Sequence, residues 1–152
     1  MENNISNTGV FGIDIVQSPE IEGLGDKFTG EGRSGHLIIL KNNNHTNNNL
    51  EFLKKVFQAV NLNLSSDCFL LDLGESDSIM VGPVLRKNKI QTMISFGVDT
   101  ANLGLQIHLQ RYQIAHLESQ KLLLADDLDS IQKNETLKRN LWNALKELYK
   151  PA

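Results

Sequence analysis

Acidic side chains follow two apolar stretches of the chain at the points where those stretches end. Asp72 and Glu75 come at the end of the run DCFLLDL, and Asp126 and Asp127 come directly after KLLLA. Carboxylates placed in this way can activate a water molecule or bind a cation. They can equally cap the helices that follow, and capping is the interpretation we favour.

Histidine and cysteine, the other residue types that often do chemistry, form no recognisable pattern. None of His36, His45, His108 and His116 has a partner at the i, i+4 spacing of an H-E-x-x-H zinc site. We interpret all four as surface or internally satisfied histidines. Cys68 is the only cysteine, so the sequence cannot form an internal disulfide or a thiolate cluster, and its apolar surroundings favour inert packing. The sequence therefore predicts no catalytic residue, no metal site and no cofactor.

Three glycines match the dinucleotide-binding pattern by spacing alone. Gly30, Gly32 and Gly35 spell G-x-G-x-x-G, which in a binding site follows a strand and opens a helix. Here the glycines precede an apolar, strand-like run, and they lack the Lys-Ser/Thr of a P-loop. We interpret them as part of a loop.

A basic stripe lies near the C-terminal end of the chain. Lys138, Arg139 and Lys146 fall on one side of an expected helix, opposite its apolar face. A solvated helix face is the simplest interpretation, and contact with phosphate or an acidic partner is the alternative. Lys138 and Arg139 are therefore candidate nucleic-acid contacts. The net charge of −3 argues against a broad basic face for duplex DNA.

Strand-like and helix-like segments alternate along the chain, and these elements must position the residues above. Four apolar runs have strand length: His36–Lys41, Asp67–Leu73, Ile90–Phe96 and Lys121–Ala125. The alternation predicts an α/β fold, a three-layer α/β/α sandwich with a mostly parallel four-stranded sheet. The stretch from Ile107 to His116 favours extended chain.

Two helices are expected with defined starts. Asn49 is the predicted cap of a helix over Leu50–Val60, and Asn134 is the predicted cap of the last helix. The apolar face of that last helix carries Leu137, Leu141, Trp142, Leu145 and Leu148. Trp142 is expected to anchor this helix to the core. A short helix broken at Pro83 and a compact one ending near Gly104 complete the set.

Composition and length are typical of one globular domain. We assign 36–152 to a single α/β domain and 1–35 to a flexible N-terminal segment. That segment contains five apolar side chains in an exposed setting: Val10, Phe11, Ile13, Ile15 and Val16. They predict either a short edge strand or a peptide that docks on a partner. With no apolar run of membrane length, no signal-like start and one cysteine, we expect a cytoplasmic protein that does not bind membranes.

Three segments together resemble the uracil-DNA glycosylase superfamily. The superfamily's helix, "GL" and strand are similar to the segment FLKKVFQAVNLNLSSDCFLLDL. Its strand–Gly–helix unit is similar to the segment NKIQTMISFGVDTANLGL. LKRNLWNALK resembles the helix that follows its His-Pro catalytic loop. The resemblance implies the glycosylase fold over roughly residues 36–149. It does not extend to the catalytic parts, since Asp126 and Asp127 stand where the His-Pro loop is expected.

The segment Ala125–Trp142 is also similar to the psi-subunit family of bacterial DNA polymerase III, which shares that fold without glycosylase activity. Five residues match its C-terminal pattern in kind: Leu128, Ile131, Asn134, Leu141 and Trp142. Both prolines of that pattern are missing. In this family an N-terminal peptide binds the clamp loader and the body binds the chi subunit, so the resemblance implies a similar role for the Val10–Val16 segment.

The expected function is a non-enzymatic, psi-like accessory protein that links replication or repair components through a clamp-loader or chi-like partner. Two alternatives remain open. One is a divergent glycosylase or other nucleic-acid hydrolase that uses Asp72, Glu75 or Asp126. The other is a single-stranded nucleic-acid-binding protein that uses Lys138 and Arg139.

Overall fold

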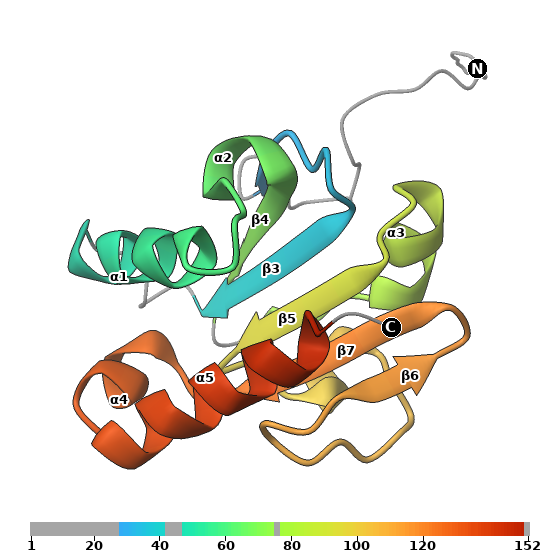
Figure 1. Cartoon of the computed structure of the whole chain (residues 1–152). Coiled ribbons are helices and arrows are strands. Elements are labelled where there is room, and N and C mark those ends of the chain that lie inside the picture. Colours follow the sequence, from blue (N-terminus) through green and yellow to red (C-terminus); the bar gives the residue numbers. More distant parts are fainter. Residues whose placement is uncertain (1–27, 42–46, 75–76, 151–152) are drawn as a thin grey trace, which may run out of the picture.

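The computed structural model describes residues 28–41, 47–74 and 77–150. Six strands of these residues form one sheet in the order β2-β4-β3-β5-β7-β6 (Figure 1). Their bounds are β2 Phe28–Gly30, β3 His36–Lys41, β4 Cys68–Leu73, β5 Thr92–Phe96, β6 Ala115–Leu117 and β7 Gln120–Ala125. The central strands β4, β3, β5 and β7 are parallel, and the short edge strands β2 and β6 are antiparallel to their neighbours.

Most residues of the central strands are buried, β3 and β5 on both faces, which explains why these strands read as nearly continuous apolar runs. In β3 the four residues from Leu37 to Leu40 are completely buried, and all of β5 is buried. Side chains alternate between the two faces, so Ile38 and Leu40 join one core while Leu37 and Ile39 join the other. The sheet therefore separates two hydrophobic cores.

Helices cover one face of the sheet almost alone. These are α1 (Asn47–Gln58), α2 (Leu64–Asp67), α4 (Leu128–Gln132) and α5 (Glu135–Leu148). The other face is covered by α3 (Val81–Lys87), the 3₁₀ helix η3 (Thr100–Leu103) and the irregular residues 105–109, whereas Tyr112 and Ile114 pack with the helices of the first face. The α/β class and the layered arrangement agree with the sequence. No helix in the described ranges is both long enough and apolar enough to cross a bilayer.

The predicted sheet of four strands is too small, because the described residues form a sheet of six strands. The four predicted runs are the four parallel strands: the bounds of β3 are as predicted, and the starts of the other three differ by one or two residues. The missed strands, β2 and β6, contain three residues each. Three residues carry no detectable alternation, so only pairing with β4 and β7 defines them.

Asn49 is not the cap of the first helix, which begins earlier, at Asn47. The side chain of Asn49 is buried and joins α1 to α4: its Nδ2 donates to Asp129 Oδ1 at 3.1 Å, and its Oδ1 accepts from Gln132 Nε2. A buried amide needs such partners, which explains a polar residue on the inner face of α1. Asn134 is the cap of α5 as predicted, because its Oδ1 accepts from the Thr136 and Leu137 amides.

Trp142 does not anchor α5, and this prediction is wrong. Leu141, Ala144, Leu145 and Leu148 fill the core face of the helix, whereas Trp142 is 40% exposed. At 3.6 residues per turn, Trp142 lies beside Leu145 but outside the arc centred on Leu141 and Leu148. Its spacing from Leu145 fits a helical repeat, so the sequence pattern placed Trp142 at the edge of the apolar stripe.

Of two other helical predictions, the break at Pro83 is wrong and the end near Gly104 is confirmed. Pro83 does not break α3, because it occupies the first turn, where its missing N–H is not needed. The 3₁₀ helix η3 ends at Gly104 with φ +68, as expected for a left-handed terminal residue.

The described end of the N-terminal segment, residues 28–35, is held against the body. Gly30, Gly32 and Gly35 do not cradle a ligand: Glu31, Arg33 and the following Ser34 donate backbone hydrogen bonds to α2 carbonyls. The loop interpretation of the glycines is therefore correct, although Phe28–Gly30 forms β2. The predicted partner-binding residues Val10, Phe11, Ile13, Ile15 and Val16 lie outside the described residues.

His36 is enclosed at the amino-terminal edge of the sheet. Its ring stacks on that of Tyr149 at 5.6 Å, and its Nδ1 lies 3.0 Å from the Ser34 carbonyl oxygen. Burial lowers the pKa of His36 below its ordinary value, although the Ser34 carbonyl and Asp67 oppose the effect. The neutral imidazole therefore packs under the end of α5.

We expect the stability of the protein to fall as the pH is lowered from about 7.5 to about 5. Because the folded-state pKa of His36 is depressed, the unfolded chain takes up its proton first, and stability is lost below the unfolded pKa of about 6.5. Denaturant unfolding across this range measures the effect. The variant His36→Phe keeps a ring against Tyr149 and should flatten the pH dependence, and His116→Gln, which replaces an exposed histidine of β6, is the control. An unchanged pH dependence in His36→Phe would contradict this assignment.

Candidate functional site

The four parallel strands end at one edge of the sheet, which is where α/β proteins usually bind ligands. The chain leaves β3 toward β4 on one side, and leaves β5 toward β7 on the other. The strand order therefore reverses between β3 and β5, and this switch point is the expected place for a site.

A shallow cleft of about 210 Å³ lies at this switch point. It is lined by Lys41, Gly74, Gly97, Val98, Asp99 and Asn102. Pockets for small molecules usually enclose about 300–1,000 Å³ and are mostly apolar, so this cleft is small. Lys41 offers one cation and Asp99 one carboxylate, which is 70% exposed.

Gly97 closes this edge against the bend that follows β7. Its φ of +85 is unfavourable for other residues, and its amide donates to the Ala125 carbonyl at 3.0 Å. A Cβ at this position would lie 2.9 Å from the Asp127 Cβ. The end of β5 and the start of α4 are therefore in direct backbone contact, which leaves no room for a ligand between them.

Asp126 is held by two residues from the irregular stretch 105–114. Arg111 forms an ion pair with Asp126 and a second one, at 3.2 Å, with Asp99. Tyr112 Oη donates to Asp126 Oδ2 at 2.7 Å and accepts from the Asp126 amide at 3.1 Å. Burial and the neighbouring carboxylate both raise the pKa of Tyr112. Because its oxygens are engaged by these two side chains, the Asp126 carboxylate is poorly placed to act as a general base.

Asp127 caps α4, as the favoured interpretation predicts. Its Oδ1 accepts from the Ser130 amide at 2.9 Å, and its Oδ2 accepts from the Ser130 hydroxyl at 3.0 Å. Capping is the wrong interpretation for Asp126, which forms the network above. Asp72 is half-buried within β4, where it pairs in register with Leu40. Glu75 lies outside the described residues.

None of the described histidines lines the cleft. His36 begins β3, at the opposite edge of the sheet, and His116 lies in β6. His108 is exposed in the irregular stretch before β6, and His45 lies outside the described residues. Cys68 is buried, and burial raises the pKa of its thiol to about 12, so it is unreactive. In the described ranges, no three His, Cys, Asp or Glu side chains form a group that could hold a metal ion.

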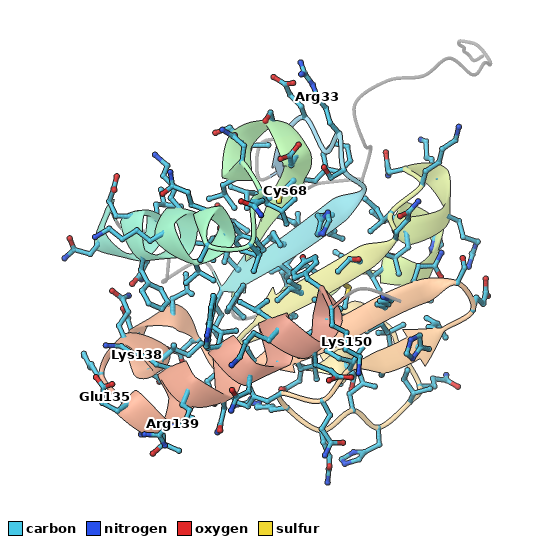
Figure 2. All side chains as sticks on the ribbon, viewed as in Figure 1. Arg33, Cys68, Glu135, Lys138, Arg139 and Lys150 are labelled. Carbon is cyan, nitrogen blue, oxygen red and sulfur yellow. The ribbon has the colours of Figure 1, made fainter. Side chains whose placement is uncertain are left out.

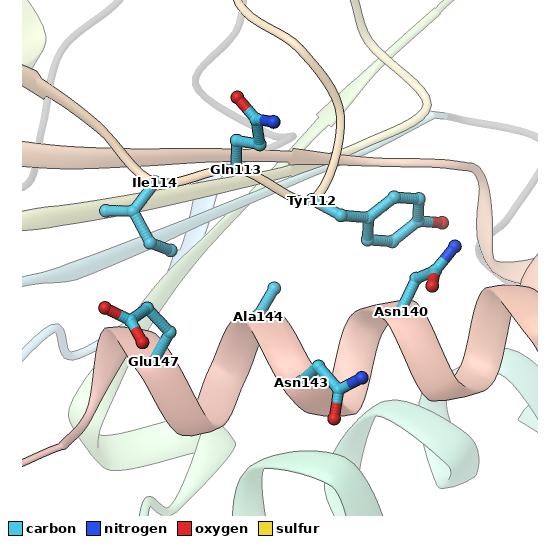
Figure 3. A pocket seen from close by; sticks show the side chains of 7 residues that line it. All are labelled: Tyr112, Gln113, Ile114, Asn140, Asn143, Ala144 and Glu147. Atoms are coloured by element: carbon cyan, nitrogen blue, oxygen red, sulfur yellow. The ribbon is translucent and has the colours of Figure 1, made fainter.

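A larger, open groove of about 470 Å³ runs along α5 (Figure 3). Asn140, Asn143, Ala144 and Glu147 line it from the helix and face Tyr112, Gln113 and Ile114. Its amide groups can exchange hydrogen bonds with a partner. Sequence reasoning did not find this groove, because its two walls come from segments that the sequence does not relate.

The candidate nucleic-acid contacts Lys138 and Arg139 lie in the first half of α5 (Figure 2). Lys138 forms an exposed ion pair with Glu135 at 3.3 Å. Arg139 is exposed and makes no ion pair within the described part of the chain. The fold brings both beside exposed Trp142, which sequence reasoning assigned to the core. Arg111 and Tyr112 were also missed, because nothing in their local pattern points to Asp126.

Comparison with known proteins adds no family assignment at this point. No protein-family model matches the chain, and no curated protein is significantly similar to it.

Proposed function

We propose that this protein is a non-enzymatic accessory protein, similar to the psi subunit of bacterial DNA polymerase III, that links replication or repair components by protein contacts. The first support is that the carboxylates Asp126 and Asp127, which follow β7, are already engaged by other groups of the protein. Asp126 is occupied by Arg111 and Tyr112, and Asp127 by the α4 amino terminus. Neither residue lines the small cleft at the switch point, and the contacts of both make them poor candidates to activate a water molecule.

The psi-like segment Ala125–Trp142 gives a second line of support, from the roles of its matched residues. Leu128, Ile131 and Leu141 are buried in the core, and Asn134 caps α5. Packing and capping account for these four residues. Trp142 is different, since its exposure gives it no comparable role in the fold. An exposed tryptophan suits a protein that works by contact.

Capture of the purified clamp-loader complex from the same organism tests the proposal. The full chain is expected to retain the complex, and deletion of residues 1–17 is expected to abolish retention. The matched control deletes residues 1–8 only, which removes the asparagine-rich start and leaves the apolar Val10–Val16 segment intact. Retention that survives the longer deletion would contradict the role given to this segment.

A glycosylase assay tests the enzymatic alternative with the same preparation. The full chain is incubated with single- and double-stranded DNA that contains uracil, and base release is measured. The proposal expects no release. Release that is lost on Asp126→Ala would overturn it, because Asp126 would then act on a substrate rather than hold Arg111.

A further inference from the structure

The outer face of α5 combines an exposed aromatic ring with positive charge. Lys138, Trp142 and Lys146 follow one another at four-residue spacing, and Arg139 lies one turn from Trp142. Residues at this spacing are neighbours on a helix surface, about 6 Å apart along the axis. We call these four residues the basic-aromatic face.

The face is accessible. Trp142 is 40% exposed and is one of two large, exposed apolar side chains among the described residues, the other being Met80. Arg139 and Lys146 are exposed and form no ion pair with another described residue. Lys138 pairs with Glu135, but an exposed pair of this kind is worth little and can be exchanged for a phosphate.

Charge is segregated toward this end of the protein. Residues 133–150 contain five Lys or Arg and two Glu, whereas the rest of the chain contains ten Lys or Arg and sixteen Asp or Glu. The segment thus carries a net charge of +3 within a chain whose total is −3. Of the two glutamates, Glu147 lies on the other side of the helix, in the groove opposite Tyr112. The net acidity of the chain is therefore no argument against a local anion-binding face.

We propose that the basic-aromatic face binds single-stranded nucleic acid, with Trp142 stacking on a base and Lys138, Arg139 and Lys146 contacting phosphates. Cations that flank an exposed ring are the combination by which such proteins hold a strand without reading its sequence. A peptide of acidic residues alone would use the cations but has no aromatic or apolar group to place on the ring. A duplex keeps its bases stacked internally, so it would also leave the ring unused. This activity goes beyond the accessory role proposed above and does not depend on it.

Fluorescence of Trp142 gives a direct test, because it is the only tryptophan of the chain. Titration of the full chain with an oligothymidylate of about 12 nucleotides should quench this fluorescence. With three phosphate contacts, the logarithm of the binding constant should fall with the logarithm of salt concentration with a slope near −2. No binding at low salt, or binding without quenching, would overturn the proposal.

Variants separate stacking from charge. The double variant Lys138→Glu, Arg139→Glu should weaken binding and make the salt slope shallower by about 1.4. The matched control, Arg86→Glu with Lys87→Glu, makes the same charge change at the end of α3, on the other face of the sheet, and should leave the slope unchanged. Equal effects of the two double variants would mean that only net charge matters, and would overturn the assignment to α5.

Trp142→Ala should weaken binding about 5- to 150-fold without changing the salt slope, measured by anisotropy of a labelled oligonucleotide. Trp142→Phe keeps an aromatic face and should restore most of the affinity. Wild-type affinity in Trp142→Ala would overturn the stacking role. Polyglutamate or a duplex of equal length that binds as tightly at the same salt would overturn the choice of a single strand.

Discussion

Replacing Leu145 with alanine is expected to lower the free energy of unfolding by about 2–5 kcal/mol, far more than the same change at Trp142. Leu145 is completely buried in the core between α5 and the sheet, so its removal leaves a cavity. Trp142 is larger but 40% exposed, and alanine is the better helix former. We therefore expect Trp142→Ala to cost less than about 1.5 kcal/mol.

Urea unfolding followed by circular dichroism measures both variants, because Trp142→Ala has no tryptophan fluorescence to follow. An unchanged dependence on denaturant confirms that the two variants share the unfolding transition of the parent. A larger loss in Trp142→Ala than in Leu145→Ala would mean that the ring is part of the core. It would also remove the basis of the nucleic-acid proposal, which needs the ring at the surface.

Replacing Gly97 with alanine is expected to destabilise the protein by about 2–4 kcal/mol. Two costs combine at this position. Its φ of +85 is strained for any residue with a Cβ, and the new Cβ would lie 2.9 Å from the Asp127 Cβ and 3.2 Å from the Asp127 Cα. Because Asp127 caps α4, the backbone there cannot move away without loss of the cap.

Gly82→Ala is the matched control for Gly97→Ala. Gly82 lies in α3, and a Cβ there would meet only Arg86 Nη1, at 3.5 Å. Alanine in a helix is favoured over glycine, so this variant should gain about 0.5–1 kcal/mol. Thermal or denaturant unfolding compares the two variants. Gly97→Ala as stable as the parent would show that the edge between β5 and α4 is open enough to admit further atoms.

The carboxyl edge of the sheet and the outer face of α5 differ in whether their charged side chains are paired. At the edge, charged groups contact one another or the backbone: Arg111 forms ion pairs with Asp99 and Asp126, and Asp127 caps a helix. On α5, Arg139 and Lys146 find no such partner in the described structure. Charges that a fold does not use are the ones free to meet a ligand.

Apolar runs and capping residues are local signals. The sequence alone was sufficient for the four central strands and for the caps Asn134 and Asp127, whereas capping was the wrong interpretation for Asn49 and Asp126. The four runs that begin with His36, Asp67, Ile90 and Lys121 are the four parallel strands, since strands buried on both faces are apolar throughout. Asn134 and Asp127 could be assigned as caps because a cap acts within three residues of itself. The α/β class follows from the order of these signals.

Contacts between distant segments were decided only by the tertiary structure. The edge strands β2 and β6 exist through their partners, Asn49 reaches α4 across 80 residues of sequence, and Asp126 is held by a loop with no local pattern. Trp142 was misplaced because a helical pattern gives the angle of a residue around the helix but not the width of the surface that covers it. Sequence periodicity predicts which residues lie on the same face of a helix, and tertiary packing decides how much of that face is buried.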